Sequence, residues 1–204
     1  KHQGSWIKTS AIGIRQSQGK YLCFLHQDDF WLSERIIKLR QLSLEFPEAV
    51  VLLHPSHFVN TASQRIGQWR CPFSKRKILL KSQDVLDRLL VQNFIAIPAP
   101  IWRREAIDSA EALDQQLWFT ADWKLWLTLA QAGSWAYLPE PLASFRIHSG
   151  AQTIKGGQAS QAYKFQYERV LDEFLLKSTA DAKIVALAKF SAEANQFLAE
   201  SFHR

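Results

Sequence analysis

Two adjacent carboxylates, Asp28 and Asp29, closely follow a short apolar run with the sequence KYLCFL (20–25). The run predicts a buried strand of a parallel sheet, and open α/β sheets bind their ligands at the edge where such strands stop. Hard oxygen ligands at that edge suit Mg²⁺ or Mn²⁺, which would bridge to the phosphates of a nucleotide. A solvated turn with a helix-capping aspartate explains the pair, taken alone, equally well.

Three basic or titratable side chains accompany this pair in the sequence. His26 precedes Asp28 by two residues and would share its face if the strand continues, as a metal ligand or a donor to phosphate. Arg146 and His148 alternate on a second short strand and share one face, where they could hold phosphate or complete a metal shell. Taken singly, a structural histidine and a half-exposed strand are the commoner explanations.

A third carboxylate, Asp122, lies in the first turn of a predicted helix with the sequence ADWKLWLTLAQA (121–132). The helix dipole favours its ionised form, and an ionised aspartate in a pocket can accept a proton from an attacking hydroxyl. Trp118, Trp123 and Trp126 would surround it. On local grounds, an ordinary aspartate at a helix start remains the favoured interpretation.

The elements that must position these residues predict an α/β fold. Apolar runs at 20–25 and 49–54 predict strands, and the segments 135–138 and 142–148 predict two further short strands. Amphipathic periodicity predicts helices over 5–18, from Ser33, from Ser82 and from Thr120 to Gly133. We expect an edge strand or loop over 94–102 and irregular structure over 60–82. After Gly156 the composition shifts, so we expect a catalytic portion over 1–157 and a helical tail over 158–204.

Composition and charge limit the classes of partner. The 204 residues carry a formal net charge of +6, which favours phosphates, acidic lipid headgroups or nucleic acid. A basic cluster between Arg70 and Lys81 suits an acidic lipid surface, although a solvated loop is the commoner outcome, and no recognition motif points to nucleic acid. Cys23 lies within an apolar run, which predicts a buried thiol in a reducing compartment. No apolar run is long enough to span a bilayer.

Three segments, in this order, resemble the family 2 glycosyltransferases of the GT-A fold. GKYLCFLHQDDFWL resembles the family's metal-binding DxD segment, LWFTADWKLWLTLAQAG its catalytic-base helix, and LPEPLASFRIHSGAQT its closing Pro-Leu-x-x-Tyr-Arg-x-His segment. The resemblance implies a GT-A-like, mostly parallel mixed sheet flanked by helices, with a helical appendage at the C-terminus. It further implies inverting transfer from a nucleotide sugar, favouring a UDP-sugar, with Mg²⁺ or Mn²⁺.

The resemblance also implies a role for each candidate residue. Asp28, with Asp29 beside it, would bind the metal, and Asp122 would be the catalytic base. Arg146 and His148 would lie near the donor diphosphate, with His148 a further candidate metal ligand. Donor-binding roles are also expected for the two remaining candidates, His26 and Trp123.

The sequence departs from the family pattern at several positions. His26 replaces the first aspartate of the DxD motif, Ser10 and Ala11 replace an Arg-Asn pair, and Ala121 replaces a common acidic residue. Family members begin with a strand, helix and strand that hold the nucleoside, and this sequence starts after them. We expect an incomplete nucleoside pocket if the 204 residues are the whole polypeptide, whereas a fragment would have that part of the pocket in the missing segment. A catalytically degenerate member that binds donor or glycan, or a peripheral module for anionic lipid surfaces, is therefore an alternative. We expect a cytoplasmic protein, with peripheral contact at the inner face of the membrane as an option.

Overall fold

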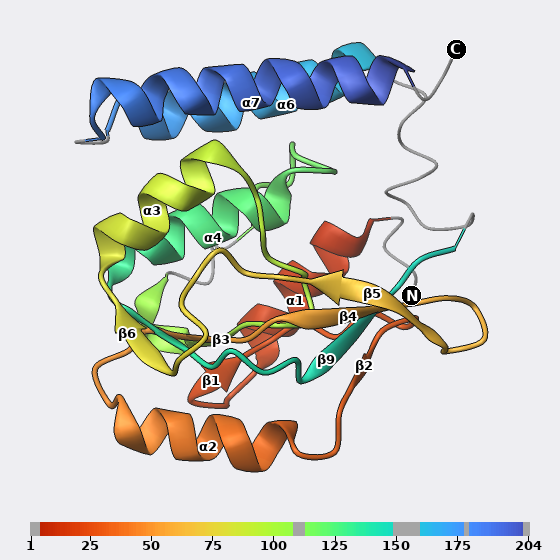
Figure 1. Ribbon diagram of the computed structural model, residues 1–204, viewed down its shortest axis with the longest axis vertical. Helices are drawn as coiled ribbons and strands as arrows, with labels where there is room; N and C mark the ends of the chain where they lie inside the picture. The colour runs from red at the N-terminus through yellow and green to blue at the C-terminus, as the bar shows by residue number, and fades with distance from the viewer. Residues whose placement is uncertain (1–4, 108–112, 149–159, 178–179, 202–204) are drawn as a thin grey trace.

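A computed structural model of the chain describes residues 5–107, 113–148, 160–177 and 180–201. Two sheets form the centre, with α2 (Arg35–Glu45) on one side and α3 (Ser82–Val91) and α4 (Ala121–Ala132) on the other (Figure 1). Two further helices, α6 (Ser160–Leu175) and α7 (Ala182–Ser201), form an outer layer beyond α3 and α4. The predicted mixed α/β class is confirmed.

The larger sheet has the strand order β1-β7-β3-β8-β6. Its strands are β1 (Tyr21–Leu22), β3 (Val51–Leu53), β6 (Ile78–Leu80), β7 (Ile101–Arg103) and β8 (Trp135–Tyr137). Strand β3 is buried throughout and pairs in parallel with β8, whereas the other pairings in this sheet are antiparallel. The prediction that KYLCFL lies in parallel pairing is therefore wrong: β1 is a short edge strand, antiparallel to β7.

The smaller sheet has the strand order β2-β9-β4-β5. Its strands are β2 (Phe30–Trp31), β4 (Ser56–Val59), β5 (Arg65–Trp69) and β9 (Ala143–Arg146). The β4–β9 pair is parallel and the other two pairs are antiparallel, so parallel pairing does not predominate among the described strands of either sheet. The prediction of irregular structure over 60–82 is wrong as well, because β5 and β6 lie there.

Most predicted helices are present, but their starts differ from the expected caps. The helix α1 (Trp6–Gln16) and the helices α2, α3 and α4 match the predicted periodicity. Helix α2 begins at Arg35 with Glu34 as its N-cap, rather than with a capping Ser33. Thr120 is the N-cap of α4 but makes no side-chain cap hydrogen bond. Packing of the buried faces therefore contributes more to these starts than capping does.

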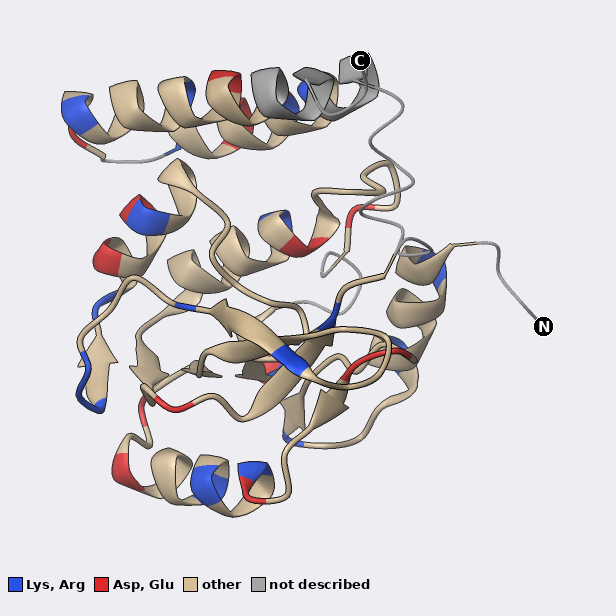
Figure 2. Cartoon of the chain, turned by 45° about the vertical axis from the view of Figure 1, so that its right-hand side comes forward, with Lys and Arg blue, Asp and Glu red and all other residues tan. Residues whose placement is uncertain are grey.

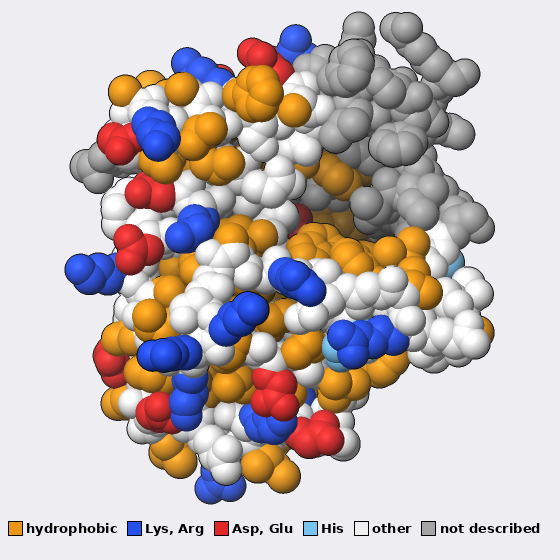
Figure 3. Space-filling view, in the orientation of Figure 1, with side chains coloured by type: hydrophobic (Ala, Val, Ile, Leu, Met, Phe, Trp, Pro, Cys, Tyr) orange, Lys and Arg blue, Asp and Glu red, His pale blue; other side chains and the backbone are white. Residues whose placement is uncertain are grey.

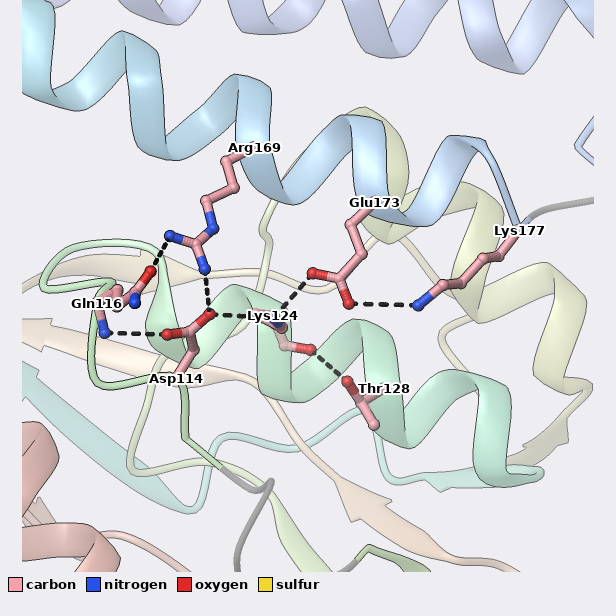
Figure 4. Close-up of polar contacts among 7 residues, drawn as sticks. All are labelled: Asp114, Gln116, Lys124, Thr128, Arg169, Glu173 and Lys177. Carbon is pink, nitrogen blue, oxygen red and sulfur yellow. Dashed lines mark hydrogen bonds and ion pairs between the residues drawn. The ribbon is translucent and has the colours of Figure 1, made fainter.

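The helices α6 and α7 share the core of the larger sheet. Val170, Leu171 and Phe174 of α6 belong to the same buried cluster as the strands and α4. Beside them, Lys124 of α4 forms ion pairs with Asp114 and with Glu173 of α6 (Figure 4). The predicted tail helices thus pack directly against the α/β body.

The two cysteines lie in different environments. Cys23 is exposed, so the prediction of a buried thiol is wrong: its neighbours Leu22 and Phe24 point inward, and a strand places alternate side chains on opposite faces. Cys71 is buried, and burial raises the pKa of its thiol to about 12. Both are free thiols.

Glycine is needed at Gly133, the C-cap of α4, because space is limited there and not because of its backbone conformation. Its φ of 163° is extended and open to any residue, but a Cβ atom there would lie 2.8 Å from Cγ1 of Val50. We expect Gly133→Ala to lower the free energy of unfolding by about 1–3 kcal/mol, because the well-packed β3 region must shift. Urea unfolding followed by circular dichroism measures this change.

The control is Gly13→Ala in α1, where a Cβ meets nothing within 4 Å. Alanine restricts the unfolded chain more than glycine does, so this variant should gain about 0.5–1 kcal/mol. Equal losses of stability in the two variants would contradict the steric explanation.

Candidate active site

A cavity of about 780 Å³ lies where α1, α4 and the ends of β1 and β9 meet. Its volume is in the range of about 300–1,000 Å³ that is usual for small-molecule sites. Both Asp28 and Asp122 line it, although 94 residues separate them in the sequence. The rest of the lining includes side chains from 5–10, 25–29, 92–97, 118–123 and 145–148, with Trp69 and Tyr167.

Asp28 and His148 form a close pair on the wall of this cavity. Nε2 of His148 lies 2.8 Å from Oδ2 of Asp28, and both side chains are partly exposed. Partial burial acts to raise the pKa of Asp28, but the hydrogen bond and charge of His148 outweigh it and hold that pKa below its ordinary value. The carboxylate is therefore ionised at neutral pH and available for a cation.

Asp29 is anchored to β9. Its Oδ1 accepts a hydrogen bond of 2.9 Å from the backbone N–H of Arg146, and only 9% of the residue is exposed. Burial raises the pKa of Asp29 to about 6, although the Arg146 hydrogen bond acts in the opposite direction. Asp29 thus ties the loop after β1 to the strand that delivers His148.

The guanidinium group of Arg146 joins three segments. Its Nε donates to the backbone carbonyl of Asp28 at 2.8 Å, Nη1 donates to that of Asn60 at 2.7 Å, and Nη2 donates to Oγ of Ser63 at 3.0 Å. These bonds fix the β4–β5 hairpin against the loop that carries Asp28. A contact of Arg146 with phosphate stays a prediction, and it has to compete with these bonds.

His26 lies deeper in the cavity wall than Asp28. Its ring contacts that of Trp6 edge-on, with 5.4 Å between the centroids. Burial lowers the pKa of His26, against the raising effect of the Asp28 charge. Its Nε2 is buried and, within the described segments, has no hydrogen-bond partner. The imidazole is therefore neutral at pH 7, with one buried nitrogen unsatisfied, and a contact of His26 with the donor stays a prediction.

Asp122 lines the same cavity from α4 and is held by Asn93. The Asn93 side-chain nitrogen donates to Oδ2 of Asp122 at 3.3 Å, and its Oδ1 accepts from the backbone N–H of Ile95 at 3.2 Å. Burial raises the pKa of Asp122 to about 6, although hydrogen bonds from the Trp123 backbone and Asn93 act to lower it. A carboxylate with this pKa is a competent base near neutral pH.

The tryptophans predicted around Asp122 occupy different depths. Trp123 lines the cavity but is 3% exposed, and its Nε1 donates to the backbone carbonyl of Leu89 at 2.8 Å. Trp126 is fully buried, whereas Trp118 is 37% exposed at the cavity wall. Trp123 is therefore mostly buried behind the cavity surface and supports the wall. Direct contact of Trp123 with the sugar donor stays a prediction.

Sequence reasoning missed Asn93 and an aromatic group on the smaller sheet. Trp69 of β5 and Phe145 of β9 line the cavity with 5.4 Å between their ring centroids, and Phe58 of β4 stacks on Trp69 at the same distance. No local pattern distinguishes Asn93 from other loop asparagines. Trp69 reaches the cavity because β5 pairs with β4 and β4 pairs with β9, and no local sequence pattern indicates these pairings.

Within the described part of the chain, no group of three or more His, Cys, Asp or Glu could hold a metal ion. The Asp28–His148 pair fits a site with two protein ligands, since its 2.8 Å separation is close to the roughly 3 Å between adjacent ligands of octahedral Mg²⁺. Such an ion usually keeps waters and binds substrate phosphates at its other positions. The residues present therefore fit an ion that arrives with a diphosphate.

The basic cluster predicted between Arg70 and Lys81 is exposed, and much of it lies on the loop before β6 (Figure 2). Lys77 of this cluster forms an ion pair with Glu45 of α2. Each helix in the described segments is too short or too polar to cross the apolar interior of a membrane. Contact with an anionic membrane surface stays a prediction.

Comparison with known proteins finds weak sequence relatives and clear structural ones. No protein-family model matches the chain. Uncharacterized proteins of Mycobacterium tuberculosis and Mycobacterium bovis are 28% identical over 138 residues, which is 67% of this chain. The chain spans 37% of the length of these relatives.

Two crystal structures of residues 1–349 of TarS from Staphylococcus aureus share the fold. The one in complex with UDP-GlcNAc has a TM-score of 0.62 at 16% identity, and covers 90% of this chain and 51% of its own. The other has a TM-score of 0.60 at 13% identity, and covers 92% of this chain and 51% of its own. The chain therefore shares the fold of TarS and spans about half of each TarS chain.

Proposed function

We propose that the protein transfers a sugar, with inversion, from a UDP-sugar to a hydroxyl of an acceptor. The observation that carries the proposal is the convergence of Asp28 and Asp122 on one cavity from segments far apart in the sequence. The lining carries an ionised carboxylate beside a histidine and, on a separate element, a partly buried carboxylate with a raised pKa. The fold shared with TarS, which was crystallised with UDP-GlcNAc, supports a nucleotide sugar as donor.

Each carboxylate has its own part in the proposed reaction. Asp122, held by Asn93, accepts the proton of the acceptor hydroxyl at one of its carboxylate oxygens. The acceptor oxygen bonds to the anomeric carbon from the face opposite the diphosphate, as the bond to the leaving oxygen breaks. Asp28 and His148 orient the diphosphate, with Asp29 and Arg146 keeping their loop in place. A bound Mg²⁺ or Mn²⁺ supplies positive charge that stabilises the leaving group.

Calorimetry with a panel of UDP-sugars, with and without Mn²⁺, tests the proposal on the full chain. We expect binding that strengthens with Mn²⁺, and release of UDP when a hydroxyl acceptor is added. No binding of any UDP-sugar under either condition would refute the proposal.

A donor-binding protein without turnover is the second candidate, because the Arg146 guanidinium is already engaged by the β4–β5 hairpin and by Asp28. A guanidinium that cannot leave these partners contributes little charge to a departing diphosphate. Tight binding of UDP-sugar without release of UDP under any acceptor would favour this candidate over transfer.

A further inference from the structure

A second cavity, of about 400 Å³, lies between α6 and α7. It shares two lining residues, Phe119 and Tyr167, with the larger cavity. The rings of these residues lie 6.1 Å apart, and the Tyr167 ring lies 5.2 Å from that of Trp123, next to Asp122 in the chain. The two cavities therefore border the same aromatic pair, Phe119 and Tyr167 (the aromatic junction), close to the candidate base. Figure 3 shows hydrophobic side chains in a recess below the helical pair.

Beyond this junction the second cavity is polar. Among the residues that the structure describes, its wall contains two exposed lysines, three exposed carboxylates and one asparagine: Lys164, Lys189, Glu168, Asp172, Glu193 and Asn195. Carboxylates accept hydrogen bonds from hydroxyl groups, ammonium groups donate to them, and aromatic faces pack against the C–H faces of sugar rings. This combination suits a ligand with many hydroxyls and alternating polar and apolar faces.

We infer that this cavity binds the distal sugars of a neutral oligosaccharide acceptor, whose terminal hydroxyl reaches Asp122 in the larger cavity. The inference rests on the proposed function, because it assigns the acceptor of the same site. The acceptor hydroxyl must lie within hydrogen-bond distance of Asp122, so the rest of the acceptor lies on the Asp122 side of the cavity. Phe119 and Tyr167 lie on that side, with the Tyr167 ring beside Trp123, and they also line the second cavity.

The lining argues against other classes of acceptor. The described lining has three carboxylates against two lysines, and this excess of negative charge disfavours an anionic polymer because it repels phosphate or uronate groups. A lipid tail would leave these charged side chains without water, which is costly. A neutral carbohydrate avoids both costs.

The test compares a disaccharide with a hexasaccharide from each of several neutral series (malto-, cello-, chito- and manno-oligosaccharides). Binding to the full chain is measured by calorimetry and by ligand-observed NMR, without donor. We expect at least one hexasaccharide to bind about tenfold or more tightly than its disaccharide, because additional charged hydrogen bonds form beyond the junction. An oligogalacturonate hexamer, which is anionic, should bind more weakly than the neutral hexamer.

The variant Glu168→Ala/Glu193→Ala removes two exposed carboxylates from the second cavity. We expect it to bind the hexasaccharide about tenfold more weakly, while its affinities for the disaccharide and for UDP-sugar stay unchanged. The matched control, Glu48→Ala/Glu105→Ala, removes two carboxylates that line neither cavity and should leave every affinity unchanged.

Four results would overturn the inference: equal affinities for short and long oligosaccharides, no binding of any neutral series, a preference for the anionic hexamer, or equal effects of the two double variants. Failure of the proposed function gives a different pattern. In that case the oligosaccharides bind with the expected dependence on length, but no UDP-sugar binds and no UDP is released.

Discussion

Asp122→Asn is expected to slow sugar transfer by about 10²–10⁴-fold, the usual contribution of a general base. Asparagine has nearly the same shape and keeps one oxygen for the Asn93 hydrogen bond, but it cannot accept a proton. Donor binding should stay unchanged, because the diphosphate is proposed to lie at Asp28 and His148, which pair with each other and belong to other segments of the lining than Asp122. Single-turnover rates of UDP release and calorimetry with UDP-sugar measure the two quantities separately.

The pH dependence of the parent protein should report the same residue. Transfer needs the ionised base, and burial raises the pKa of Asp122 to about 6, so kcat should fall as pH drops below about 6 and level off above it. The residual rate of Asp122→Asn should lack this step.

The stability of the folded protein gives an independent test of the raised pKa of Asp122. A carboxyl group whose pKa is higher in the folded than in the unfolded protein binds its proton more tightly in the folded state. The free energy of unfolding therefore falls as pH rises from the pKa of the unfolded state through about 6. Removal of the ionisable group should therefore leave Asp122→Asn at least as stable as the parent at pH 7. Thermal unfolding of the two proteins at pH 7 compares them.

Asp114→Asn is the matched control, since Asp114 lies just before the same helix but holds Lys124 and Arg169 in ion pairs (Figure 4). It should lower Tm and leave kcat nearly unchanged. A similar loss of kcat in both variants, or full activity of Asp122→Asn, would remove Asp122 from the role of base.

The sequence was sufficient to predict that distant segments form one cavity. The strand-like run before Asp28, the helix that begins beside Asp122 and the segment that ends at His148 each have a strong local pattern. Hydrophobic periodicity places such segments on the core, and the polar residue at the end of each segment then lies at an edge of the sheet. Both carboxylates line the same cavity, as this reasoning expects.

The interactions of Arg146 could not be predicted from the sequence, because they depend on long-range pairing. Its partners Asn60 and Ser63 lie in a hairpin of polar residues with little apolar alternation, which gave no strand signal. Parallel pairing of β4 with β9 brings this hairpin beside Arg146. The same pairing brings Trp69 to the cavity, so both omissions have one cause.

The exposure of Cys23 and the mixed pairing of the sheets show a related limit. An apolar run of six residues predicts a strand but does not reveal whether both of its faces are covered. Strand β1 lies at the edge of its sheet, and Cys23 and Leu25 alternate outward while Leu22 and Phe24 face the core. Whether two strands pair in parallel or antiparallel depends on which segments become neighbours in the sheet. The local sequence of one segment does not encode this.

Asp28→Asn is expected to weaken the Mn²⁺-dependent part of UDP-sugar binding by about 100-fold or more, comparable with the larger losses seen when metal-site residues are changed. The amide has lost the negative charge that attracts a cation, and its nitrogen cannot act as a ligand. Nε2 of His148 lies 2.8 Å from Oδ2 of Asp28, and His148 should remain in place. It follows β9 closely, and β9 is held by the hydrogen bond that the backbone N–H of Arg146 donates to Asp29. Calorimetry with and without Mn²⁺ isolates the metal-dependent part.

Asp29→Asn provides the comparison, because it changes the adjacent carboxylate by the same chemistry. The amide oxygen of the variant can still accept the hydrogen bond from the Arg146 backbone N–H, so the loop and β9 should stay joined. If Asp28 and His148 hold the ion while Asp29 anchors the loop, Asp29→Asn should retain most Mn²⁺-dependent binding and Asp28→Asn should lose it. Equal losses would assign both carboxylates to the metal, and unchanged binding in Asp28→Asn would show that the donor diphosphate is held without it.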